Sequence, residues 1–155
     1  MSSDKVSIAA SLFIIAGVIG FLSLFLTWVK TRVVFTTVGS YSGLDVLSGS
    51  SPAGGQWAAI ILVVCWAIFV MEGIIFLQNP NKPLPYIIYG AILATFIATM
   101  TVIIVPGSWG MALFESAIAG IGAYVVLFAM IFTLIGVVLI ENGTRSGERP
   151  PRTFW

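Results

Sequence analysis

Four long apolar runs dominate the pattern of this 155-residue chain. They cover Val6–Val29, Trp57–Leu77, Leu84–Val105 and Ala117–Ile140. A helix needs roughly 20 residues to cross the hydrocarbon core of a bilayer, and each run is about that long. The runs are continuously apolar rather than alternating, and a segment in lipid must satisfy its own backbone hydrogen bonds, so helices are expected. The sequence therefore predicts an all-α membrane protein, a bundle of four transmembrane helices.

Turn residues between the runs divide the chain into one membrane domain and a tail. Gly54-Gly55 precedes the second run, and Asn79-Pro80-Asn81 separates the second from the third. We predict a four-helix transmembrane domain over residues 1–141, which includes a polar loop at 30–56. A tail at 142–155, rich in Pro, Arg and aromatic residues, follows it.

Positive charges are distributed unequally between the two sides of the predicted bundle. One side carries Lys5, Lys82, Arg145, Arg149 and Arg152, and the other carries Lys30 and Arg32. By the positive-inside rule this favours cytoplasmic N- and C-termini in a multi-pass protein of the cell membrane. The sequon Asn142-Gly143-Thr144 would then face the cytoplasm, so a glycan there would reverse the orientation.

The loop at 30–56, on the outer side, is predicted to hold a short strand or turn. Arg32–Val38 is rich in Val, Phe and Thr, which favours a strand. Tyr41 leads into Ser42-Gly43-Leu44-Asp45, in which Ser42 and Asp45 have the spacing of a helix-capping pair. The loop is interpreted either as a linker that covers the helix ends or as a recognition loop, and Tyr41 and Asp45 are its candidate residues.

Aromatic residues gather where the predicted helices end. Trp28, Trp57 and Trp109 fall at the outer ends, and Tyr86 and Tyr89 fall near the inner start of the third run. Such positions are typical of the aromatic belts at the two membrane interfaces. An aromatic ligand cage is the alternative interpretation.

Composition excludes most reactive chemistry. The chain is 59% hydrophobic and 8% charged, and it has no histidine and a single cysteine, Cys65. Without histidine there is no Ser-His-Asp triad, no HExxH zinc site and no His-ligated haem. A net charge of +1 disfavours nucleic acid as a partner. We expect no enzyme, no cofactor and no metal, and we expect membrane lipids around the chain.

Glu72 is the one charged residue within the four runs. A carboxylate inside a membrane is costly, and it is therefore a candidate site for an ion or a proton. In the alternative interpretation Glu72 reaches the inner interface and pairs with Lys82. Glu115, just before the fourth run, is expected to favour the positive end of that helix dipole.

Small residues at regular spacing predict close helix packing. They are Gly90, Ala94 and Ala98 in the third run, Ala16 and Gly20 in the first, and Gly120 and Ala123 near the start of the fourth. Small side chains let helices approach one another in lipid. These residues can hold the four helices together or can contact neighbouring subunits, and the sequence leaves both open.

The tail combines cationic and aromatic residues with two prolines. Pro150-Pro151 favours an extended backbone, and Arg and Trp are frequent anchors at protein interfaces. Arg149, Arg152, Phe154 and Trp155 are therefore predicted to dock onto a partner. Contact with anionic lipid headgroups is the alternative.

Leu26-Thr27-Trp28, followed by Ser42-Gly43-Leu44-Asp45 before the second run, resembles a loose class of small prokaryotic four-transmembrane proteins with a Trp…SGLD outer loop. The similarity covers about Phe21–Ala59. That class commonly has Pro before the Trp, and this chain has Thr27 there. The resemblance implies the four-helix fold and no activity.

Three functional hypotheses follow. The first is a non-catalytic, small integral membrane subunit that packs against a larger membrane complex and stabilises or assembles it, with other integral subunits or further copies of itself as partners. The second is a homo-oligomeric channel, or a proton or ion carrier, that uses Glu72. The third is an outer-face binding module built on the loop at 30–56.

Overall fold

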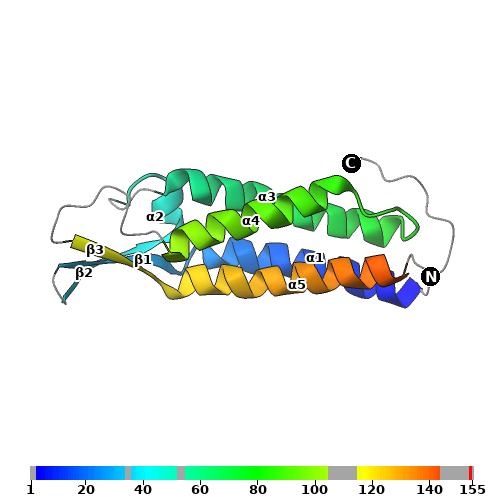
Figure 1. Ribbon diagram of the computed structural model, residues 1–155, viewed down its shortest axis with the longest axis horizontal. Coiled ribbons are helices and arrows are strands. Elements are labelled where there is room, and N and C mark those ends of the chain that lie inside the picture. The colour runs from blue at the N-terminus through cyan, green and yellow to red at the C-terminus, as the bar shows by residue number, and fades with distance from the viewer. Residues whose placement is uncertain (1–2, 34–35, 52–54, 105–114, 144–153, 155) are drawn as a thin grey trace.

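The computed structural model describes residues 3–33, 36–51, 55–104, 115–143 and 154. Four helices are long and apolar enough to cross a membrane, and they lie side by side along the long axis of the molecule (Figure 1). They are α1 (Ser3–Ser23), α3 (Gln56–Gln78), α4 (Tyr86–Ile104) and α5 (Ile121–Gly143). The predicted four-helix membrane bundle is confirmed, and the chain is a multi-pass integral membrane protein.

The helices form a bundle in which α1 and α4 lie on opposite sides. Both α1 and α4 contact α3 and α5, and the contacts of α1 are the more extensive. The first turn of α1 and the last turn of α5 lie at the same end of the bundle, which we call the terminal end (Figure 1). A small sheet lies beyond the opposite end, which we call the sheet end.

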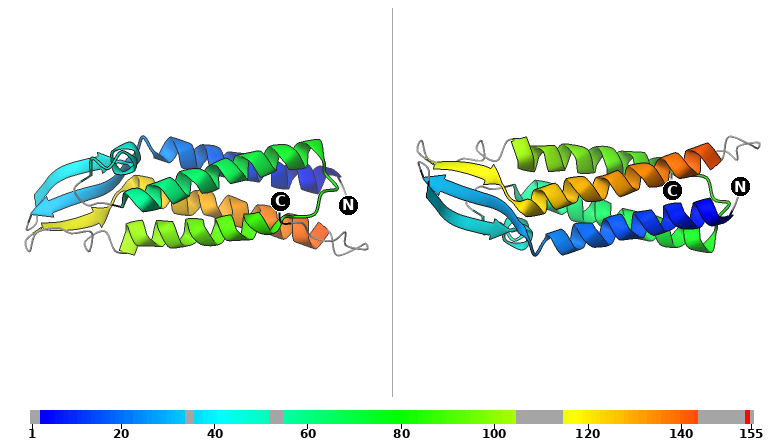
Figure 2. Two further views of the ribbon diagram at one scale, coloured as in Figure 1. Left: turned by 90° about the horizontal axis from the view of Figure 1, so that it is seen from above. Right: turned by 90° about the horizontal axis from the view of Figure 1, so that it is seen from below.

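Three antiparallel strands form this sheet in the order β2-β1-β3. They are β1 (Thr27–Val33), β2 (Thr36–Ser42) and β3 (Glu115–Ala119), and the short helix α2 (Gly43–Leu47) follows β2. Val29 in the central strand lies opposite Tyr41 on one side and Ala119 on the other. Figure 2 shows the sheet projecting from the bundle beside α2. The predicted strand at Arg32–Val38 straddles the β1–β2 hairpin, because the chain reverses within that range.

The first helix is shorter than the sequence predicts. α1 ends at Ser23 rather than at Val29, and β1 begins at Thr27. Aromatic and β-branched residues such as Trp28 and Val29 fit a strand as well as a helix, and here both are completely buried. The predicted interfacial position of Trp28 is therefore wrong.

The fourth helix begins later than predicted, because β3 occupies the start of the fourth run. Glu115–Ala119 pairs with β1, and α5 starts at Ile121 rather than at Ala117. Glu115 thus begins a strand, and its predicted place at a helix start is wrong. Local sequence permits either structure, and the antiparallel pairing with β1 decides between them.

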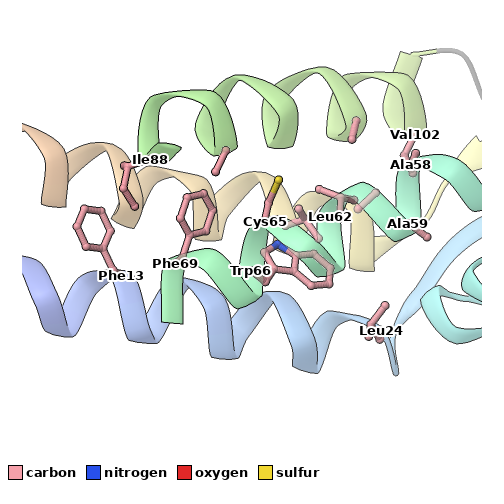
Figure 3. Close-up of a cluster of buried hydrophobic side chains, with 14 of the residues drawn as sticks. Phe13, Leu24, Ala58, Ala59, Leu62, Cys65, Trp66, Phe69, Ile88 and Val102 are labelled. Carbon is pink, nitrogen blue, oxygen red and sulfur yellow. The ribbon is translucent and has the colours of Figure 1, made fainter. Parts of the chain in front are cut away.

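The bundle interior is packed with aromatic and aliphatic side chains. Phe13, Trp66, Phe69 and Ile88 point into the space between the helices (Figure 3) and are at most 1% exposed. The ring of Phe13 also lies 6.1 Å from that of Phe76. In lipid such close packing, rather than exclusion of water, holds helices together.

Candidate functional site

The junction between the bundle and the sheet is built around the indole ring of Trp28. The side chain is completely buried, and its Nε1–H donates to the backbone oxygen of Ser23 at 2.9 Å. The same oxygen also accepts from Leu26 N–H at 2.9 Å, so the Trp28 bond is a second one to the carbonyl where α1 ends. The ring also packs edge-on against Trp66 of α3, with centroids 6.1 Å apart and planes at 86°.

Two glycines make room for the Trp28 ring. A Cβ atom at Gly43 would lie 2.7 Å from a ring atom, and a Cβ at Gly122 would collide with the ring. The ring is therefore enclosed by α2, α3 and α5. Trp28 and Gly43, which carry the resemblance noted above, are in direct contact, and the contact gives that pattern a structural explanation.

The turn after β2 is closed by a capping box. Ser42 N–H donates to Asp45 Oδ2 at 2.7 Å, Ser42 O–H donates to the same oxygen at 2.8 Å, and Asp45 N–H donates back to Ser42 Oγ at 3.2 Å. The predicted capping pair is confirmed. Both bonds from Ser42 favour the charged carboxylate and lower the pKa of Asp45 below its usual value.

The sheet presents a polar surface beyond the sheet end of the bundle. Thr36, Thr37 and Ser40 on β2 are exposed, and the candidate residue Tyr41 is half-buried. Among the described strands, none pairs with the outer edge of β2 or of β3. Strand edges with free backbone groups are ready sites for pairing with another chain.

Glu72 is buried near the terminal end of α3, where it is paired. Its Oε2 lies 3.4 Å from Lys82 Nζ, and the side chains of Glu72 and Lys82 are 8% and 19% exposed. The pairing predicted as the alternative to an ion site is therefore present, and it compensates a charge that would otherwise be costly to bury. Carriage of ions or protons by Glu72 stays a prediction, and Glu72→Gln should then abolish flux in reconstituted vesicles.

A second polar contact at the terminal end joins α4 to α5. Tyr89 O–H donates to Glu141 Oε1 at 2.6 Å. Glu141 was not a candidate from the sequence, because nothing local indicates that it meets a residue so distant along the chain. This bond places Tyr89 in a helix contact with its side chain partly buried, while Tyr86 is 51% exposed as an interfacial residue would be.

The structure divides the predicted small-residue positions into two groups. Ala16, Ala98 and Ala123 are buried in the bundle, a Cβ at Gly20 would lie 2.5 Å from the Trp66 ring, and a Cβ at Gly120 would collide with the backbone of Thr27. These five residues therefore form internal contacts.

Gly90 lies apart from those internal contacts, and Ala94 is only partly buried against the core. Gly90 is exposed, and a Cβ there would meet no atom within 4 Å. The buried face of α4 instead carries Ala91, Thr95, Ala98 and Thr99. Gly90 therefore does not pack against another helix of this bundle, contrary to the prediction.

Gly90 and Ala94 line an open groove between α3 and α4, of about 440 Å³. Its α3 wall consists of Ile60, Ile61, Val64, Cys65 and Ile68, and its α4 wall includes Tyr86, Ile87 and Ala91. Phe154, near the C-terminus, also lines it. We call this feature the α3/α4 groove. It is an open apolar hollow, and a hollow of this kind binds hydrophobic groups.

The remaining tail candidates, Arg149, Arg152 and Trp155, lie outside the described residues, as does Trp109. Within the described part of the chain, no three His, Cys, Asp or Glu side chains gather closely enough to hold a metal ion. Comparison with protein-family models, with curated proteins and with solved structures found no match to this chain.

Proposed function

We propose that this protein is a non-catalytic, small integral membrane subunit that packs against a larger membrane complex and stabilises or assembles it. The observation that supports the proposal is the firm attachment to a membrane bundle of a sheet whose outer edges pair with no other described strand. Trp28 fixes the sheet to three helices, so the edges of β2 and β3 are held in a set position relative to the membrane. A preorganised surface loses little conformational entropy when it binds.

Two surfaces are available for partner subunits. The outer edge of β2, which pairs with no other described strand and carries the exposed Thr36, Thr37 and Ser40, offers backbone groups for pairing with another chain. The outward faces of the four helices carry large apolar side chains, among them Val18, Leu22, Leu93 and Phe128, which are 45–60% exposed. Those faces fit lipid or other transmembrane helices.

The proposal is tested by co-purification of the full-length protein from native membranes in mild detergent. We expect larger membrane subunits to accompany the wild-type chain. The double variant Thr37→Lys/Ser40→Lys places two charges on β2 and should release those subunits. Ser50→Lys adds the same charge at an exposed position outside the sheet, and it should retain them. Recovery of free monomer alone from native membranes would overturn the proposal.

The same sheet also supports a second candidate, a binding module that faces away from the membrane. Its rigid attachment to the bundle suits presentation of the polar β2 surface to a ligand. In that case the Thr37→Lys/Ser40→Lys variant should have the same co-purifying subunits as the wild type, or none if the wild type is a monomer. It should differ from the wild type only in losing the ligand. The two candidates therefore give opposite results with one variant.

A further inference from the structure

We propose that the α3/α4 groove binds one acyl chain of a membrane phospholipid, whose phosphate lies near Lys82. The inference is independent of the proposed function, because the groove lies along the membrane-spanning helices rather than at the sheet. Its walls belong to two spans, so the hydrocarbon of the bilayer surrounds its mouth.

The groove exists because small residues on α4 face large ones on α3. The α4 wall has Gly90 and Ala94, where the α3 wall has isoleucine and valine. Apart from its chain neighbours and the backbone of its own helix, no described atom lies within 4 Å of a Cβ placed at Gly90. An unfilled apolar hollow forfeits van der Waals contact on one side, so in a bilayer the neighbouring lipid is expected to fill it.

The size of the groove suits a hydrocarbon chain better than a helix. Ile60 and Ile68 are about 12 Å apart along α3, at 1.5 Å per residue. An open hollow of about 440 Å³ that extends over this length has room for a chain of methylene groups. A partner helix, about 10 Å across, would enter it only with the side chains of one face.

A paired charge lies just beyond one end of the groove. Ile61, Cys65 and Ile68 line it at helical spacing, and Glu72 continues the same stripe about 6 Å further along the helix. Lys82 Nζ lies 3.4 Å from Glu72 Oε2 and remains partly exposed. An ammonium group has three donors, so the bond to Glu72 leaves donors for a phosphate oxygen. This arrangement of apolar groove and cation matches the acyl chain and phosphate of a phospholipid.

Aromatic side chains complete the lining. Tyr86, in the first turn of α4, lies on the terminal side of the groove, and Phe154 joins it from the C-terminal segment. Aromatic residues are favoured at the depth where acyl chains meet headgroups. They therefore agree with a lipid that enters the groove from the terminal end.

Photocrosslinking tests the inference on the wild-type protein. The full-length chain is reconstituted in phosphatidylcholine vesicles that contain a phosphatidylcholine with a diazirine in one acyl chain, and the crosslinked peptides are mapped. We expect labelling of residues 60–68 and 87–94 several-fold above that of other lipid-facing segments. Equal labelling of all exposed helix faces would overturn the inference, because it would show only general lipid contact.

Variants test the same site by filling it. Gly90→Leu places a side chain in the groove, and it should reduce both the enriched labelling and the phospholipid retained per chain in mild detergent by roughly tenfold. Ser11→Leu adds comparable bulk at an exposed position on α1, and it should change neither. Lys82→Met should lower retention of intact phospholipid more than acyl-chain labelling. Thermal unfolding of each variant verifies that it is folded. If Gly90→Leu does not fold, the crosslinking map of the wild-type protein still tests the inference.

Results for lipid and for protein partners can be separated. If Gly90→Leu loses larger membrane subunits while its phospholipid content is unchanged, the occupant is a partner helix, and the inference is wrong although the proposed function stands. If Gly90→Leu loses phospholipid while the wild-type protein is a free monomer in native membranes, the inference stands and the proposed function fails.

Discussion

Replacing Trp28 with alanine should detach the sheet from the bundle while the four helices stay assembled. The substitution removes a completely buried indole, its edge-on contact with Trp66 and the hydrogen bond to the Ser23 carbonyl. Gly43 and Gly122, which leave space for the ring, would then border a cavity. The two glycines have no side chain to move into it, and partial collapse would come from neighbours such as Leu62, Val102 and Val126.

The expected cost is about 3–5 kcal/mol, the range for replacing a buried Phe or Trp by alanine. The Ser23 carbonyl keeps its bond from Leu26 N–H in the variant, so most of this cost is the lost packing of the ring. A loss of 3 kcal/mol or more raises the open population of the junction roughly a hundredfold, since each 1.4 kcal/mol is about a factor of ten. Trp28→Phe keeps part of the packing and should cost less.

Limited trypsin digestion in mild detergent measures this opening. Lys30 and Arg32 lie in the central strand β1, where pairing on both sides protects them. In Trp28→Ala, cleavage after these residues should be at least tenfold faster than in the wild type. Lys82 lies at the terminal end, and its cleavage should not change.

Trp57→Ala is the matched control, because Trp57 is 49% exposed in the first turn of α3. It removes the same side chain and should leave cleavage of β1 unchanged. Equal protection of β1 in both variants would refute the role assigned to Trp28, because the sheet would then be held by other contacts.

Three further predictions concern single side chains. Gly20→Ala should lower the free energy of unfolding in detergent by about 1–3 kcal/mol, because its Cβ would overlap the Trp66 ring in α3. Gly90→Ala should leave the free energy of unfolding nearly unchanged. Equal effects of the two substitutions would contradict the packing described for these glycines. Lys82→Met should destabilise the protein by about 1–3 kcal/mol by leaving the Glu72 carboxylate unpaired, and Glu72→Gln added to it should restore much of the loss in the same measurement. Folding lowers the pKa of Asp45, so the carboxylate contributes its full stabilisation above about pH 4 and loses it as the pH falls through the pKa of the folded state. The thermal unfolding temperature of Asp45→Asn should therefore depend less on pH in this acidic range than that of the wild type. An unchanged pH dependence would contradict this role of Asp45.

The four helices and the capping turn were predictable because local sequence decides them. A run of about 20 apolar residues is stable across a bilayer only as a helix, whatever its neighbours are. The capping pair depends on two side chains three positions apart, Ser42 and Asp45, and it was confirmed atom by atom. The contact of Glu72 with Lys82 was within reach of the sequence for a similar reason, since both lie near one helix end.

The sheet and the placement of small residues depended on tertiary structure. Glu115–Ala119 is a strand because it meets β1, which lies far away in sequence, and nothing local distinguishes it from the first turn of a helix. Trp28 has the sequence features of an interfacial residue, and it is buried because Gly43 and Gly122 make room for it. Likewise, the spacing of Gly90 and Ala94 predicted a helix contact, but the direction of that face is set by how α4 packs on α3 and α5. Sequence alone therefore determined which segments enter the membrane, whereas long-range packing decided where the spans end and which faces remain open, because those outcomes depend on contacts between segments distant along the chain.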